Sequence, residues 1–303
     1  MKKKKILIVG GTGFIGYHLA KKCLYKKFNV TSLSTKLPKK LRKIKKVKYL
    51  RCDISEKKKL KKSIRNDYDY VVNLGGHVNH KDKIKTYKSH FIGVKNLIDI
   101  FTNSDLKGFV QIGSGGEYGK LKSPHIESKS GNPKSIYYKS KLLSTNLIIK
   151  KFKKKKFPGV VLRLYQVYGP KQDFNRLIPI VIKNCINNKK FNCTEGIQFR
   201  DFIYVEDVVS AILSALEKKK AHGKIFNIGT SKKIKIKNLI DKINKQVGKG
   251  VPLYGKIKLR NDENIVSYPS ITKVKRILNW QPKIHFNYGL KKTINEVKNR
   301  KKK

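Results

Sequence analysis

A chain of 303 residues is long enough to bury a substantial core, either as one domain or as two that share an interface. Its 39% hydrophobic and 10% aromatic content argues against disorder along the whole chain. The formal net charge of +54 comes mainly from lysines spread from end to end, whereas nucleic-acid binders concentrate charge and favour arginine. We therefore expect solvated lysines, no specific nucleic-acid partner, and a weak, salt-dependent attraction to anions.

Cysteine usage and hydropathy both bear on where the protein works. No CxxC pair or regular framework is formed by the four cysteines, which are Cys23, Cys52, Cys185 and Cys193. This pattern is typical of reduced thiols in a cytoplasmic protein. His77 and His80 have a metal-like spacing but lack a second ligand pair, so no metal site is predicted. No stretch approaches the roughly 20 apolar residues that a membrane span needs. A soluble, cytoplasmic protein is expected.

The first half of the chain alternates short apolar runs with helical periodicity. Strands are predicted at residues 6–9, 29–34, 47–51, 70–74, 109–112 and 160–164. Helices are predicted at residues 14–27, 87–101 and 136–151. This alternation indicates βαβ units, and the wholly apolar strand cores fit a parallel sheet buried on both faces. The predicted fold class is α/β, a doubly wound parallel sheet with helices on both sides.

After Leu164 the rhythm loosens, and the remaining elements are shorter. They are separated by loops that contain Pro170, Pro179, Pro252, Pro269 and Pro282. No long linker divides this part from the first. We expect a smaller C-terminal lobe that packs against the sheet domain.

The turn after the first strand carries a GxxGxxG pattern made by Gly10, Gly13 and Gly16. In such a turn the first glycine permits a tight bend and the second lets the backbone approach a pyrophosphate. The third lets helix and strand pack closely, so that the phosphates meet the helix N-terminus. Phe14 and Ile15 open that helix and belong to the same predicted cofactor site. The context favours a Rossmann-like dinucleotide site over an ordinary turn.

The end of the second strand bears on which dinucleotide is bound. An acidic residue there would hold the adenosine ribose, but Ser34, Thr35 and Lys36 stand in its place. Without the acid a 2′-phosphate is not repelled, and Ser34 and Lys36 carry groups that can bind one. The cofactor is predicted to be NAD or NADP, with a modest preference for NADP. Asp53 is placed to meet the adenine, and the alternative is a helix N-terminal acid before Ser55.

Tyr137 and Lys141 are four residues apart at the start of a predicted helix, so they share one face. A tyrosine pKa near ~10 makes a poor base at neutral pH, but a neighbouring ammonium stabilises the phenolate. The pair can then exchange a proton with a sugar hydroxyl or carbonyl while hydride moves to or from a nicotinamide. Ser114 follows an apolar strand, where its hydroxyl is placed to hydrogen-bond the reacting oxygen.

Together these motifs resemble those of extended short-chain dehydrogenases/reductases, in the NAD-dependent epimerase/dehydratase family that acts on sugar nucleotides. The resemblance runs over nearly the whole chain. Its motifs are residues 10–16, 53–54, 73–76, 114–119, 137–141, 163–170, 200–207, 226–229 and 280–282.

The resemblance implies a role for several residues. It makes Ser114, Tyr137 and Lys141 the catalytic triad, with Lys141 also holding the nicotinamide ribose. It puts Arg200 on the diphosphate of the substrate, with an ion pair to Asp201 or Glu206 as the alternative. Further cofactor contacts are expected from Ile54, Leu74, Gly75 and Gly76.

The resemblance also divides the chain and suggests an assembly. The dinucleotide-binding domain would take residues 1–166 and about 201–228, and the substrate lobe about 167–200 and 229–303. A homodimer is expected on the resemblance alone. His90 and Gln166 stand where the family usually has asparagine, and both are expected to reshape the substrate pocket; Gln166 is counted as a substrate contact.

The two residues after Ser114 narrow the choice of reaction. Sugar-nucleotide 4,6-dehydratases of this family carry an Asp-Glu pair there, but this chain has Gly115 and Gly116, which disfavours dehydration. A 4-epimerase, which recycles its cofactor, is slightly favoured over an NADPH-consuming 4-keto reductase. A non-catalytic NADP-binding scaffold that interacts with RNA is the alternative of another class. The paired Tyr137 and Lys141 argue against it.

Overall fold

A computed structural model describes residues 3–259 and 263–301. Its centre is a seven-stranded parallel sheet with the order β11-β6-β5-β4-β1-β2-β3. The strands are β1 Lys5–Val9, β2 Asn29–Ser34, β3 Lys48–Arg51, β4 Tyr70–Asn73, β5 Gly108–Ser114, β6 Gly159–Leu164 and β11 Ile225–Ile228. The strand order steps outward in both directions from β1, which is the doubly wound arrangement that was predicted.

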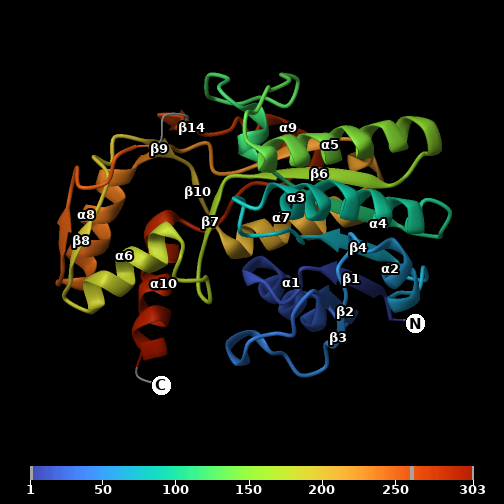
Figure 1. The fold of residues 1–303 in the computed structure, drawn as a ribbon, viewed down its shortest axis with the longest axis horizontal. Coiled ribbons are helices and arrows are strands. Elements are labelled where there is room, and N and C mark those ends of the chain that lie inside the picture. Colours follow the sequence, from blue (N-terminus) through green and yellow to red (C-terminus); the bar gives the residue numbers. More distant parts are fainter. Residues whose placement is uncertain (1–2, 260–262, 302–303) are drawn as a thin grey trace.

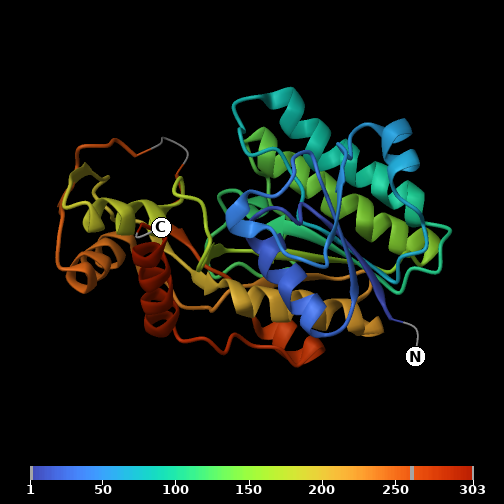
Figure 2. The same ribbon diagram turned by 90° about the horizontal axis from the view of Figure 1, so that it is seen from below.

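Helices cover both faces of the sheet, as Figures 1 and 2 show. One buried cluster joins one face of the sheet to α1, α7 and α9, and a second joins the other face to α2, α4 and α5. These helices are α1 Phe14–Tyr25, α2 Lys57–Ser63, α4 Gly93–Phe101, α5 Ile136–Lys155, α7 Val205–Glu217 and α9 Thr272–Leu278. Residues 6–9 of β1 are at most 3% exposed, because this strand lies between the two layers.

Four short helical segments complete this part: η1 Lys40–Arg42, α3 Lys83–Tyr87, η3 Gly115–Tyr118 and η4 Lys219–Ala221. Between α3 and α4 lies a π-helical turn, η2 Lys88–Ile92, so the helix predicted at 87–101 begins earlier and carries an irregular turn. The predicted strands are all present within a few residues. Strand β11 was not predicted, because it is only four residues long and Asn227 interrupts its apolar pattern.

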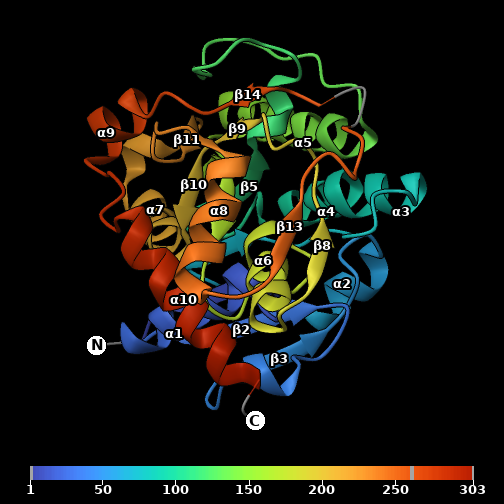
Figure 3. The same cartoon turned by 90° about the vertical axis from the view of Figure 1, so that its left-hand side faces the viewer.

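A smaller lobe stands beside the end of the sheet, and Figure 3 views it face on. Its core is a third buried cluster, drawn from residues 168–204 and 234–297. The helices are α6 Leu177–Ile186, α8 Ile236–Val247 and α10 Phe286–Lys301. The strands are β7 Gln166–Tyr168, β8 Lys190–Asn192, β9 Phe199–Arg200, β10 Phe202–Tyr204, β12 Ile234–Lys235, β13 Val251–Leu253 and β14 Val266–Ser267. The residue limits of the two lobes stay a prediction, and residues 302–303 lie outside the described part.

All four cysteines are free thiols, as predicted. Across residues 3–259 and 263–301, no helix is long and apolar enough to cross a membrane. In the same part of the chain, no group of three or more His, Cys, Asp or Glu side chains is arranged to hold a metal ion.

The unpredicted strand β11 gives a test of the core. Phe226 is fully buried in the cluster that joins the sheet to α1, α7 and α9. Phe226→Ala is expected to lower the free energy of unfolding by about 3–5 kcal/mol, because it leaves a cavity. Tyr25→Ala, at a side chain that is 80% exposed, should change it by about 0.5 kcal/mol or less. Urea denaturation measures both. Equal, small effects would show that β11 does not belong to the core.

Candidate active site

The predicted site residues gather at one edge of the sheet. In a parallel sheet all carboxyl ends lie on the same side, and ligands bind in the crevice beyond them. Gly10 follows β1, Ser34 ends β2, Leu74 follows β4 and Ser114 ends β5. Residues that lie far apart in the sequence therefore meet at one edge of the sheet, where this rule predicts a ligand crevice.

The glycine turn after β1 has the geometry that was predicted. Gly10 has φ +76°, and a Cβ there would lie 2.9 Å from the backbone nitrogen of Gly75. A Cβ on Gly16 would overlap the carbonyl oxygen of Gly10, so helix α1 packs directly on the turn. Gly13 is the N-cap of α1, with no side-chain cap and no acidic residue in the first turn. The exposed N–H groups of this helix end suit a pyrophosphate.

The residues that follow or end β2 and β3 were predicted to meet the adenosine half of a dinucleotide. The Ser34 hydroxyl accepts a hydrogen bond from the Thr12 amide at 3.4 Å, which ties β2 to the glycine turn. Lys36 is exposed. The Asp53 carboxylate accepts from the Ser55 amide at 2.8 Å, in the turn before α2, whose N-cap is Glu56. Both the adenine contact and the helix N-terminal alternative for Asp53 stay predictions.

The chain that leaves β4 closes the crevice on the other side of the glycine turn. Gly75 lies against Gly10, and its amide donates to the Asn73 side chain at 3.0 Å. Leu74 is partly buried against the sheet, and Gly76 is exposed. Ile54 is 6% exposed and packs beneath Gly93.

Helix α5 carries Tyr137 and Lys141 on one face and packs against β5 and η3. The Lys141 ammonium donates to the Ile112 carbonyl of β5 at 2.7 Å and lies 5.9 Å from the centre of the Tyr137 ring. Ser114 ends the same strand, and its hydroxyl accepts from the Gly116 amide at 3.2 Å. The structure thus brings Lys141 and Tyr137 to the strand end that carries Ser114.

The electrostatics of this pair differ from the sequence-based expectation. Burial lowers the pKa of Lys141 to about 8. Burial also raises the pKa of Tyr137, with the like charge of Tyr138 and then of Glu117 adding to it. The expected lowering of this pKa by the neighbouring ammonium is not found, because the ammonium is directed to the Ile112 carbonyl and burial has the larger effect on the phenol.

Two histidines that were not assigned to the triad touch Tyr137. His80 stacks on the phenol ring at 3.9 Å between centroids, and His90 meets it edge-on at 4.8 Å. His90 is 4% exposed, and burial together with the charge of Lys141 lowers its pKa to about 2. It is therefore neutral. The ring of His90 also fills the space beside Gly76.

The two glycines after Ser114 lie against aromatic rings. A Cβ on Gly115 would come within 2.8 Å of the Tyr165 ring, and a Cβ on Gly116 would overlap the Tyr138 ring. The space that side chains at positions 115 and 116 need is already occupied. An acid–base pair at these positions would require both tyrosines to move.

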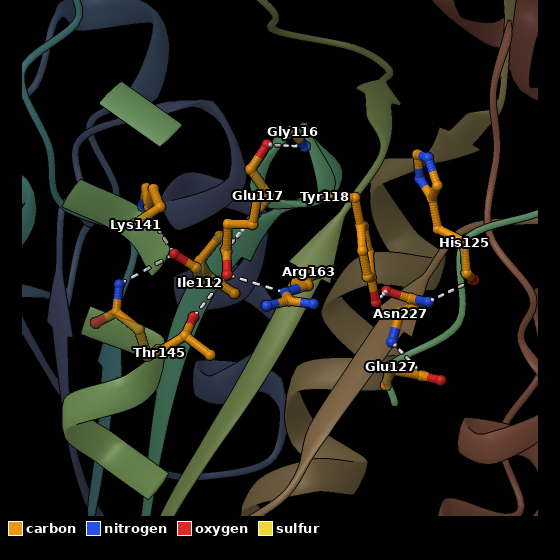
Figure 4. A network of polar contacts seen from close by, with 12 residues as sticks. Ile112, Gly116, Glu117, Tyr118, His125, Glu127, Lys141, Thr145, Arg163 and Asn227 are labelled. Carbon is orange, nitrogen blue, oxygen red and sulfur yellow. Dashed lines mark hydrogen bonds and ion pairs between the residues drawn. The ribbon is translucent and has the colours of Figure 1, made fainter. Parts of the chain in front are cut away.

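Glu117 is a site residue that the sequence-based interpretation missed. It is fully buried and accepts hydrogen bonds from the Ser114 amide at 2.8 Å, the Thr145 hydroxyl at 2.8 Å and Arg163 Nε at 2.9 Å, as Figure 4 shows. The signal was present, because Ser114 and Glu117 have the spacing of a capping box. On the other side of Arg163, the Tyr118 hydroxyl donates to the Asn227 side chain at 2.9 Å.

Arg200 and Gln166 lie in β9 and β7, where the smaller lobe begins. Arg200 forms an ion pair with Glu263 and donates to the carbonyls of Phe199 at 2.8 Å and Ile265 at 3.3 Å. The alternative pairing of Arg200 with Asp201 or Glu206 is wrong, since Asp201 is buried and accepts from the Thr230 amide instead. Gln166 has an exposed side chain, and its amide donates to the carbonyl of Asp201 at 3.0 Å.

The chain is similar to known proteins of one family. The model of the NAD-dependent epimerase/dehydratase family matches residues 6–229. A putative UDP-glucose 4-epimerase of Methanocaldococcus jannaschii is 30% identical over 97% of this chain and 98% of its own. The dTDP-D-glucose 4,6-dehydratase of Dictyostelium discoideum is 31% identical over 79% of this chain and 61% of its own.

A solved structure has the same fold. The UDP-glucuronic acid 4-epimerase of Bacillus cereus, crystallised with UDP-glucuronic acid and NAD, superposes with a TM-score of 0.88. It is 26% identical and covers 98% of this chain and 99% of its own. Relatives of both reaction types, epimerases and dehydratases, therefore match.

The buried ammonium predicts a pH dependence. Lys141 has a pKa of 10.5 when exposed and about 8 in the fold, so between these values the unfolded chain binds more protons. Stability therefore rises with pH in that window. Relative to Lys141→Met, the wild-type free energy of unfolding should increase by about 1.4 kcal/mol per unit between pH 8 and 10. Denaturant titrations at a series of pH values measure this difference. Parallel profiles would mean that the amine is not desolvated.

Proposed function

Because the chain belongs to the NAD-dependent epimerase/dehydratase family, we propose that it is an NAD(P)-dependent 4-epimerase of a sugar nucleotide. The observation that carries the proposal is the packing of α5 on the end of β5. It holds Lys141 against the Ile112 carbonyl, two residues before Ser114 on β5, and Tyr137 lies one turn earlier on the same helix face. The substrate class is suggested by the relatives that act on UDP- and dTDP-sugars.

The dinucleotide would lie with its phosphates at the N-terminus of α1, where Gly13 leaves the helix end uncapped. Once bound, it supplies a nicotinamide that takes hydride from the sugar C4 and returns it. Tyr137 accepts the proton of the C4 hydroxyl and later gives it back, and the Ser114 hydroxyl hydrogen-bonds the same oxygen. Lys141 holds the nicotinamide ribose. The positive charge of an oxidised nicotinamide ring near Tyr137 would counteract the burial that raises the pKa of this phenol.

Epimerisation is preferred to dehydration because of the space after Ser114. A dehydratase needs an acid and a base beside the catalytic hydroxyl, and the rings of Tyr165 and Tyr138 fill that volume against Gly115 and Gly116. Tyr165 is itself engaged, since its hydroxyl is 2.7 Å from His125 Nδ1. No group at positions 115 or 116 is left to exchange protons with the sugar.

A 4-keto reductase that consumes NADPH is the second candidate. It is favoured by the end of β2, where Ser34 and the exposed Lys36 leave room for a 2′-phosphate and no acid repels it. The Asp53 carboxylate already accepts the Ser55 amide, which supports the view that this acid does not replace the missing one. We therefore keep the modest preference for NADP, although the similar epimerase from Bacillus cereus was solved with NAD.

The assembly is proposed to be a homodimer. Helix α5 presents Leu143, which is 43% exposed, and the neighbouring α3 presents Ile84, which is 69% exposed. Two apolar side chains on adjacent helices fit a self-complementary contact. A cytoplasmic location stays a prediction, and the non-catalytic RNA-interacting scaffold is disfavoured by the buried Lys141.

The enzyme proposal is tested by removing one oxygen atom. Tyr137→Phe should lower kcat by about 10²–10⁴-fold, because the acid–base group is lost while the ring remains. Cofactor affinity should stay unchanged, and Tyr87→Phe on α3 serves as the matched control. Turnover is measured on a panel of sugar nucleotides, after mass spectrometry of ligands carried through purification. Retained turnover in Tyr137→Phe would defeat the assignment.

The same assays separate the two reactions. An epimerase retains its dinucleotide tightly and converts the substrate without net change in nicotinamide absorbance. A reductase oxidises NADPH in proportion to a 4-keto sugar. RNA affinity that survives moderate salt, without turnover of any sugar nucleotide, would favour the scaffold instead.

A further inference from the structure

A fully buried carboxylate lies directly behind the catalytic turn. Glu117 has no exposed surface, and its charge is balanced by Arg163, which is 2% exposed and donates from Nε at 2.9 Å. Burying such a pair is costly and does not by itself make a fold more stable than an apolar packing would. The placement of Glu117 therefore calls for an account beyond stability.

The two oxygens of Glu117 join three elements of the crevice. Oε1 accepts the Ser114 amide at 2.8 Å, at the end of β5. Oε2 accepts the Thr145 hydroxyl of α5 at 2.8 Å, as well as Arg163 Nε of β6. Figure 4 shows the carboxylate between Thr145 and Arg163. The turn that carries Ser114 is thus tied through one carboxylate to the helix opposite.

That helix is the one that carries the other two members of the triad. Thr145 follows Tyr137 and Lys141 at intervals of four residues, so all three lie along one face of α5. A second tie between the same elements is the bond from Lys141 Nζ to the Ile112 carbonyl. Two hydrogen bonds, one turn apart on the helix, therefore set the position of α5 along β5.

We propose that Glu117, acting through Thr145, is a positioning residue that sets the place of Ser114 relative to Tyr137. The carboxylate suits this task because it can only accept hydrogen bonds. Each surrounding N–H or O–H group must therefore point its hydrogen at the carboxylate. Arg163 supplies the opposite charge that lets the carboxylate stay buried. The proposal rests on the proposed roles of Ser114 and Tyr137.

The consequence is catalytic, because the two hydroxyls must reach the same substrate oxygen. Misplacement of a reacting group by about 1 Å can cost about 100-fold in rate. Glu117 and Thr145 are fully buried, so we expect them to act through Ser114 and α5 and not by direct contact with a ligand. Loosening them should therefore act on kcat and leave KM unchanged.

Thr145 offers a matched pair of variants. Thr145→Val keeps the shape and removes the hydroxyl, whereas Thr145→Ser keeps the hydroxyl. With turnover counted per bound cofactor, Thr145→Val should lower kcat about tenfold, with KM and cofactor affinity unchanged within about twofold. Thr145→Ser should retain kcat within about twofold. Glu117→Gln should lower kcat further, because the amide NH₂ of glutamine is itself a donor and would face one of the donors that now bond to the carboxylate.

A control separates positioning from stability. Asp207 is another buried carboxylate, on α7, and it accepts the amides of Lys283 and Ile284 at 2.9 and 3.0 Å. Asp207→Asn should lower the melting temperature while kcat per folded enzyme is retained. If Thr145→Val also lowered only the melting temperature, the positioning role would be overturned.

A readout without turnover keeps the two proposals distinct. Amide hydrogen exchange of residues 112–119 in the cofactor-bound protein should be at least about threefold faster in Thr145→Val than in Thr145→Ser. If the wild type converts no sugar nucleotide, the proposed function fails. The hydrogen-exchange measurement then still tests whether Thr145 holds the turn that carries Ser114. Equal exchange in the two variants overturns that link.

Discussion

The crevice depends on the contact between one face of α5 and the end of β5. Lys141 donates from Nζ to the Ile112 carbonyl at 2.7 Å, from a side chain that is 4% exposed. An ammonium held there has lost most of its water, which is why its pKa falls to about 8. The contact fixes α5 next to the strand that ends at Ser114. Without it, the parallel sheet would still collect strand ends at one edge, but Tyr137 would have no defined place among them.

The many lysines that give the chain its large positive charge lie almost entirely outside this site. Within the described residues, Lys141 is the only lysine that is buried, and the others are partly or fully exposed. In the described part of the chain, nearly all the lysines behind the net charge of +54 thus stand at solvated positions, as their even spread along the sequence predicted. A field of this sign raises the local concentration of anionic ligands, including sugar nucleotides, and weakens as salt is added. Lys141 differs from these lysines because its ammonium is buried and has a defined hydrogen-bond partner.

The sheet and the shared helix face of Tyr137 and Lys141 were predictable because their signals are local. The apolar runs at 6–9 and 29–34 form strands, as their hydrophobic pattern predicted. The four-residue spacing of Tyr137 and Lys141 puts both side chains on one helix face. Contacts between distant residues carry no such signal. Arg200 pairs with Glu263, sixty-three residues away, and the raised pKa of Tyr137 depends on burial in the fold. Glu117 lies between these cases, because its capping box is local while its bonds to Thr145 and Arg163 are not.

In the proposed reaction, a nicotinamide held by this chain would take hydride from the sugar C4 and return it to the same carbon. The most direct measurement uses a sugar nucleotide that carries deuterium at C4, incubated with the enzyme in ordinary water. The C4 epimer is then isolated and its deuterium content is measured by mass spectrometry. Hydride return predicts that the epimer keeps the deuterium at C4. An epimer that has exchanged it for solvent hydrogen would show that the C4 bond is broken by proton loss, which contradicts the account.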